Sequence, residues 1–186
     1  AVTTPEERTD EALMTARDAY TRAFDIASAA GLDGLAIDAV HMMAFVDDAP
    51  AEQLKWDEQA LAMVLASSQP AGKAWEASIR NNLGNALHDL GRDAESLPHF
   101  ERALALREAR GNAEAVYIAR WLVARALRLT GRLDEALALQ TRLEGEMDVV
   151  GGPDRYVFEE LEQIHRARGD AAKAAAYAER LAALRA

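Results

Sequence analysis

The chain has 186 residues, of which 50% are hydrophobic and 28% charged, a composition that supplies ample material for a folded core. It contains no cysteine, which excludes a disulfide framework and a thiolate zinc site. No apolar run approaches the roughly 20 residues that a membrane helix needs. We therefore expect a soluble, cytoplasmic protein.

The net charge of -10 is unevenly distributed. Residues 1–74 carry 5 Lys+Arg against 13 Asp+Glu, whereas the remaining 112 residues carry 16 against 18. Affinity for nucleic acid comes largely from basic side chains that neutralise phosphates, and this chain has no basic stripe. Nucleic acid is therefore not the expected partner.

Helix signals begin near the N-terminus. Thr4 as an N-cap and Pro5 in the first turn predict a helix start, and Gly31 predicts the end of that helix. Two further helices are expected over residues 34–46 and 51–66, where apolar residues recur at steps of three or four. The first third of the chain is thus predicted to be helical.

A loop is expected over residues 67–72, where Ser, Gln, Pro and Gly gather. It is short enough to join neighbouring helices. After it, the apolar stripe of a fourth helix is formed by Trp75, Ile79, Leu83, Leu87 and Leu90.

The turn that follows this fourth helix recurs along the chain. The hexapeptide that begins at Gly91 has counterparts that begin at Asp48, Gly131 and Gly169, so the spacings are 43, 40 and 38 residues. A period near 40 with two helices per unit indicates an α-solenoid, in which each helix pair covers the apolar face of its neighbour. We expect an all-α solenoid of about seven helices.

One unit carries a specific set of residues. Leu83 and Gly84 lie in its first helix, Gly91 at the turn, and Phe100 and Ala103 in its second helix. By this pattern the chain resembles the tetratricopeptide repeat (TPR) family over roughly residues 34–186. The run Asn-Asn-Leu-Gly, followed by Arg-Ala-Leu-Ala-Leu-Arg-Glu, is similar to the longer repeats of kinesin light chains.

The resemblance implies a single TPR-like domain over residues 1–186. Its units are expected at residues 34–68, 75–110, 113–148 and 154–186, with residues 5–31 as part of a further unit.

In this family the helices form a right-handed superhelix, and the first helix of each pair lines a concave groove that accepts a peptide. Steps of four and three residues place Asn81, Asn85 and His88 on one side of their helix. Together with the positions that correspond by family alignment, the candidate groove residues are Asn81, Asn85, His88, Trp121, Arg125, Arg128, Gln163 and Arg166.

These residue types suit an extended peptide. An Asn amide can donate to and accept from a peptide backbone, and an Arg guanidinium can bind an acidic side chain or a terminal carboxylate. Each candidate also has a structural alternative. The asparagines could bond neighbouring helices, Arg125 and Arg128 could pair with Asp89, Glu159 or Glu162, and Trp121 could belong to the core.

Catalytic motifs are missing from the sequence. The four histidines form no His-Glu-x-x-His arrangement, and there is no phosphate-binding Gly loop or Gly-x-Ser-x-Gly elbow. His88 and Asp89 are adjacent and so lie on different helix faces. We expect no enzyme activity, no cofactor and no metal.

The predicted function is a scaffold that binds an extended peptide or partner protein bearing acidic groups or a terminal carboxylate. Two alternatives are a self-assembly module, such as a homodimer, and a ligand-sensing regulatory domain of a larger signalling protein.

Overall fold

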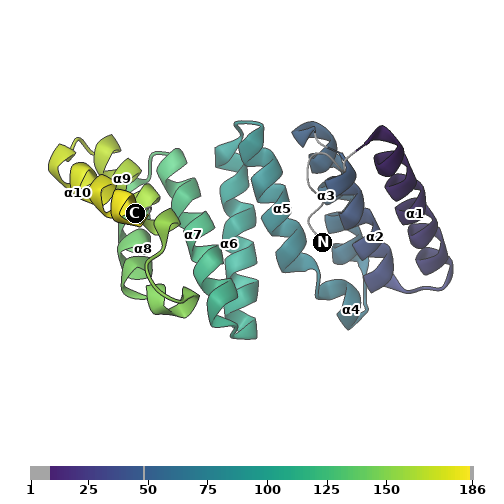
Figure 1. Ribbon diagram of the computed structural model, residues 1–186. Coiled ribbons are helices and arrows are strands. Elements are labelled where there is room, and N and C mark those ends of the chain that lie inside the picture. Colours follow the sequence, from purple (N-terminus) through teal and green to yellow (C-terminus); the bar gives the residue numbers. More distant parts are fainter. Residues whose placement is uncertain (1–8, 48, 185–186) are drawn as a thin grey trace. The chain divides into compact units, whose positions relative to one another are not determined.

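The computed structural model describes residues 9–47 and 49–184, and over these residues the chain is helical without strands (Figure 1). It divides into two compact units, Ala1–Arg92 (unit 1) and Asp93–Ala186 (unit 2). The predicted all-α class is confirmed, with more helices than the expected number of about seven. None of the described helices is both long and apolar enough to cross a membrane.

Unit 1 contains one long helix followed by shorter ones. Its helices are α1 (Asp10–Ala29), α2 (Asp33–Val46), α3 (Pro50–Ala66), the single-turn α4 (Pro70–Lys73) and α5 (Glu76–Asp89). α1 packs on α2, α2 on α3, and α3 on α5, side by side in Figure 1. The packed faces meet in one apolar core, whose large buried side chains include Ile37, Val64, Ile79 and Leu83.

The first described helix is capped by a threonine side chain. The expected N-cap, Thr4, lies outside the described residues. The helix that the structure shows begins at Asp10, and the Thr9 hydroxyl oxygen accepts a hydrogen bond from the Ala12 amide at 3.2 Å. Thr9 therefore caps α1, because a side-chain acceptor satisfies one of the unpaired amides of the first turn.

The segment expected as a loop, residues 67–72, includes the start of α4. Pro70 begins this turn of helix, since its fixed φ suits a first helical position. The segment is fastened to the α1–α2 turn, because the Ser67 hydroxyl donates to Asp33 at 2.5 Å and the Gln69 amide donates to the Gly31 carbonyl at 2.7 Å. Gly34 allows this close approach: a Cβ there would lie 2.9 Å from the Cβ of Ala71.

A polar junction ties the first three helices together. The Asp47 carboxylate accepts hydrogen bonds from the Arg17 guanidinium of α1 at 2.6 Å and from the Trp56 indole of α3 at 2.7 Å. The Arg17 guanidinium, together with the indole, holds the pKa of Asp47 below its usual range. One side chain just after α2 thus bonds to α1 and to α3, which both pack against α2.

Unit 2 follows the same plan. Its elements are α6 (Asp93–Arg110), α7 (Ala113–Leu129), α8 (Leu133–Gly145), the 3-10 helix η2 (Met147–Val150), α9 (Arg155–Ala167) and α10 (Ala171–Ala183). Each α-helix packs on the next, and α7 also contacts η2 and α9. The core lies between these helices and includes Phe100, Val123, Leu143, Leu161 and Ile164.

Glycine turns follow α5 and α7, at Gly91 and Gly131, where the sequence predicted turns between helices. At Gly131 the backbone has φ +79°, which places this residue in the left-handed region. Its amide donates to the Arg128 carbonyl, and the Arg132 amide donates to the Leu127 carbonyl at 2.8 Å. The Gly91 turn has the same pattern of bonds. This is the Schellman arrangement, which satisfies the last carbonyls of a helix and favours Gly at the left-handed position.

We predict that Gly131→Ala lowers the free energy of unfolding by about 1 kcal/mol, because a Cβ is unfavourable at positive φ. Gly145→Ala is the matched control: a Cβ there would meet no atom within 4 Å, and its φ is not in the left-handed region. That substitution should be neutral or stabilising, since Ala favours a helix over Gly. Urea denaturation measures both variants, and an equal loss in the two would contradict the role of the turn.

Candidate functional site

The eight predicted groove residues belong to both units. In unit 1 they lie on α5 and are Asn81, Asn85 and His88. In unit 2 they lie on α7 and α9 and are Trp121, Arg125, Arg128, Gln163 and Arg166.

Arg128 is committed to a structural contact. Its guanidinium donates two hydrogen bonds to the Glu160 carboxylate, at 2.6 and 3.0 Å, and this carboxylate is buried. A two-point contact of this kind fixes both side chains. The ion-pair alternative holds for Arg128, although the partner is Glu160 of α9 instead of the expected Asp89, Glu159 or Glu162. The pair joins α7 to α9 and leaves Arg128 little capacity to bind a ligand.

Trp121 packs against the core of unit 2 and remains partly exposed. It is half-buried, and its indole N–H donates to the Tyr156 carbonyl of α9 at 3.1 Å. The Tyr156 ring meets it edge-on, with centroids 5.8 Å apart. The Arg125 guanidinium carbon lies 5.6 Å from the indole centroid. Among the described residues Arg125 forms no ion pair, so this guanidinium remains able to bind an anionic group.

A pocket of about 260 Å³ opens beside Trp121. Its lining comes from α7, η2 and the start of α9, and consists of Tyr117, Ile118, Trp121, Val150, Asp154 and Tyr156. Ile118 and Tyr156 are 46% and 49% exposed. We call this hollow the Trp121 pocket. A second, more open hollow shares Ile118 and Tyr156 and extends along residues 150–155.

Gln163 and Arg166 do not line the Trp121 pocket. Both are exposed on α9, and the Arg166 guanidinium pairs with Glu162 one turn earlier on the same helix. An exposed pair of this kind contributes little to stability.

Unit 1 contains a smaller, polar pocket of about 130 Å³ between α2, α3 and α5. Its lining residues are Ala44, Phe45, Gln53, Asp57, Asn82, Asn85, Ala86 and Asp89. Of the three residues predicted on α5, only Asn85 lines it. We call it the Asp57 pocket.

Asp57 is the most unusual side chain of this pocket. It is only 2% exposed, and its Oδ1 atom has no hydrogen-bond partner among the described residues. Burial raises the pKa of this carboxyl to about 7, because removal from water disfavours its charged form. The nearby Asn82 amide instead contacts the Nδ1 atom of His41 at 3.2 Å, joining α5 to α2 as the structural alternative for these asparagines proposed.

Asp57, Ile118 and Tyr156 are not among the site residues predicted from the sequence. For Asp57 a signal was present: it lies between Leu54 and Ala60 at helical spacing on the apolar stripe of α3. A carboxylate on an apolar stripe loses contact with water on folding, so it is a candidate for a functional side chain. Ile118 and Tyr156 lie on different helices. The segment between α7 and α9 brings them to one pocket, and no local sequence pattern shows this.

Comparison with known proteins supports the repeat assignment. The sequence model of the tetratricopeptide repeat matches residues 75–145, which extend from just before α5 to the end of α8. The resemblance to this family that was predicted from turn and helix residues is thus confirmed over residues 75–145. No curated protein matches the chain.

Several solved structures share the fold. One contains the nearly identical TPR-like repeats assigned to a kinesin light chain of Podosopora anserina. It has 16% identity and a TM-score of 0.75, and the match covers 96% of this chain and 89% of that one. The MamA protein has 12% identity and a TM-score of 0.58, with 89% and 90% covered. The predicted all-α solenoid class is thus confirmed. Tetratricopeptide repeats generally mediate protein–protein interaction or assembly.

We predict that Arg128→Ala lowers the free energy of unfolding by about 3 kcal/mol, because it leaves the buried Glu160 carboxylate without its partner. Arg166→Ala removes an exposed ion pair and should change the free energy of unfolding by no more than about 0.5 kcal/mol. Chemical denaturation compares the two. Similar values for both variants would show that the Arg128–Glu160 pair does not stabilise unit 2.

We predict that Asp57→Asn stabilises the protein at pH 8 and has little effect at pH 4. The pKa of Asp57 is about 7 in the folded chain and near 3.8 when unfolded, so the folded state binds more protons between these values. Stability from this group is present below pH 4 and is lost as the pH rises to about 7. The loss amounts to at most about 4 kcal/mol. Thermal unfolding across this range tests the prediction, and a gain from Asp57→Asn that is independent of pH would contradict it.

Proposed function

We propose that the chain is a protein–protein interaction scaffold and that the Trp121 pocket is a docking site for an extended segment of the partner. The observation that carries this proposal is the apolar lining of the pocket together with the exposure of Ile118 and Tyr156. Apolar side chains that gather around an open hollow are typical of interaction sites. Trp and Tyr at the centre of such a hollow are the residue types that anchor interfaces most often.

The partner segment, in this proposal, places an apolar side chain in the Trp121 pocket and an acidic group or terminal carboxylate on Arg125. Arg125 is supported for this role because it lies against the Trp121 ring and forms no ion pair among the described residues. Arg128 is not supported for this role, because its guanidinium is already bonded to the buried Glu160 carboxylate. Of the two arginines predicted on α7, the proposal thus keeps Arg125 as the anion-binding one.

The other predicted residues are secondary in this proposal. Gln163 and Arg166 offer exposed polar contacts further along α9, and Asn81, Asn85 and His88 offer contacts on unit 1. We propose that residues 1–186 act as one TPR-like domain, without a catalytic step. A cytoplasmic location is supported by the lack of cysteine, which suits a reducing compartment.

Selection from a random-peptide display library on the immobilised protein tests the proposal, followed by calorimetry with the enriched peptides. We expect an aromatic or aliphatic residue followed by Asp or Glu. Ile118→Ser should weaken binding at least about tenfold, because it makes the rim of the pocket polar. Ile26→Ser on α1 is the matched control, since Ile26 is 70% exposed and lines none of the pockets above; it should leave binding unchanged. Full affinity in Ile118→Ser would overturn the proposal.

A second comparison isolates Arg125. Arg125→Gln should weaken an enriched peptide about tenfold, and should have little effect on the same peptide with its acidic residue changed to the amide. If Arg125→Gln weakens both peptides equally, the guanidinium does not contact the acidic group. Light scattering of the free protein over a range of concentrations tests the self-assembly alternative.

A further inference from the structure

One oxygen of the Asp57 carboxyl, Oδ1, is buried without a hydrogen-bond partner among the described residues. Buried polar atoms are nearly always hydrogen-bonded, because an unpaired one loses its bonds to water without compensation. Among the described residues the Oδ1 atom of Asp57 is an exception: it is buried and unpaired, on a side chain that lines a pocket. A donor that enters this pocket would complete the missing bond.

We propose that the Asp57 pocket binds the ammonium group of a lysine side chain from the partner protein. This inference deepens the proposed function, on which it rests, by assigning a second contact with the opposite charge preference to that of Arg125. With this contact, unit 1 binds the partner directly, in addition to the contacts made by unit 2.

The polar lining of the pocket favours a donor. Asp57 and Asp89 contribute carboxylates, and none of the described lining residues is a Lys or an Arg. Two of the amide donors nearby are already used, because the Gln53 amide donates to the Asp47 carbonyl at 2.8 Å and the Asn82 amide contacts His41. The pocket therefore presents mainly acceptors to an incoming group.

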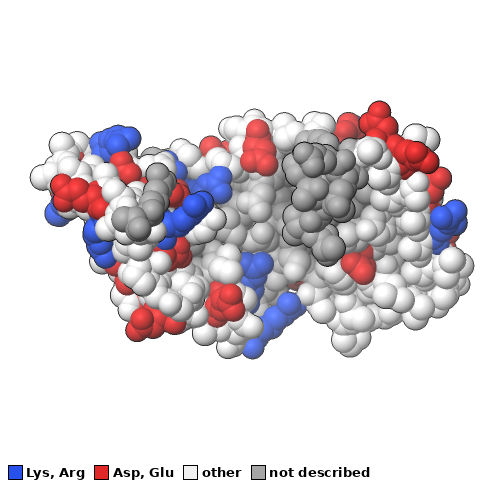
Figure 2. Space-filling view, in the orientation of Figure 1, with Lys and Arg blue, Asp and Glu red and all other residues white. Residues whose placement is uncertain are grey.

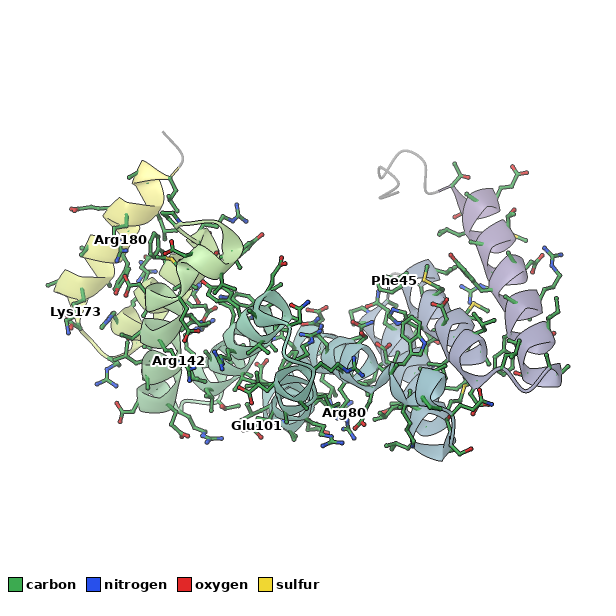
Figure 3. All side chains as sticks on the ribbon, turned by 90° about the horizontal axis from the view of Figure 1, so that it is seen from below. Phe45, Arg80, Glu101, Arg142, Lys173 and Arg180 are labelled. Carbon is green, nitrogen blue, oxygen red and sulfur yellow. The ribbon has the colours of Figure 1, made fainter. Side chains whose placement is uncertain are left out.

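The charge of the surrounding unit points the same way. Residues 1–92 carry 7 Lys+Arg against 15 Asp+Glu, a net charge of -8, and Figure 2 shows mainly acidic side chains over the end of unit 1 that bears α1. Arg80 of α5 is paired with Glu76 at 2.9 Å, and Figure 3 shows it at the edge of unit 1 opposite to Phe45. An incoming cation is attracted by this unit and meets no basic side chain among the described residues of the pocket.

The size of the pocket selects a compact cation. Its volume of about 130 Å³ equals that of roughly four water molecules, which is enough for an ammonium group and its last methylenes. An ammonium presents three donors from a single point, whereas a guanidinium needs a planar, fork-shaped partner. Phe45, 53% exposed at the rim, offers apolar surface to the alkyl stem.

The test titrates n-butylammonium chloride into the isotopically labelled full chain at pH 8, with NMR detection of the Asn85 side-chain amide. We expect saturable shifts with n-butylammonium, and neither n-butanol nor n-butylguanidinium should match them. Asp57→Asn should weaken binding at least about tenfold. Asp25→Asn, the same charge change on the exposed face of α1, should leave it unchanged.

Several results would overturn the inference: no saturable shift, equal shifts with n-butanol, stronger binding of n-butylguanidinium, or unchanged affinity in Asp57→Asn. Unfolding does not confuse the result, because Asp57→Asn removes a buried charge and is expected to be at least as stable as the parent at pH 8. The probe requires no partner, so this test can fail while the Ile118 experiment succeeds, and the reverse also holds. Ile118→Ser in unit 2 should bind n-butylammonium normally.

Discussion

Each described helix of α1 to α3 and of α7 to α9 buries its apolar stripe against the helices packed beside it, and the rest of the structure depends on this constraint. The stripe of α3 is covered by α2 and α5, and that of α7 by its neighbours α6 and α8. Because the helices must reverse direction within a few residues, the turns use Gly in the left-handed conformation, as at Gly91 and Gly131. Packing and turn chemistry together produce the repeat.

The same constraint determines where polar side chains acquire unusual properties. A polar group between packed helices is removed from water and must find a partner in the chain or in a ligand. Glu160 finds Arg128, and Asp47 finds Arg17 and Trp56, so these groups stabilise the packing. The Oδ1 atom of Asp57 has no such partner among the described residues. This difference distinguishes carboxylates that stabilise the packing from one that is a candidate for binding a ligand.

Much of the fold was predictable from the sequence because spacing and turn residues are local signals. The 40-residue period, the helix pairs and the glycine turns follow from residues close together in the chain.

The partner of Arg128 was not predictable in this way, since Glu160 lies 32 residues away and is one of several acidic residues on α9. The Trp121 pocket likewise depends on how η2 leads α9 back to α7. The helical turn at Pro70 was missed because Ser67, Ser68 and Gly72 nearby favour turns and loops.

The central claim is that a partner segment docks between neighbouring helices, on side chains that the packing leaves exposed. The most direct measurement is of intermolecular NOEs between an enriched peptide and the methyl groups of the protein. The account predicts contacts from the apolar side chain of the peptide to the Ile118 methyls and the Tyr156 ring. Contacts only to exposed apolar residues outside the pocket, such as Ile26 on α1, would contradict it.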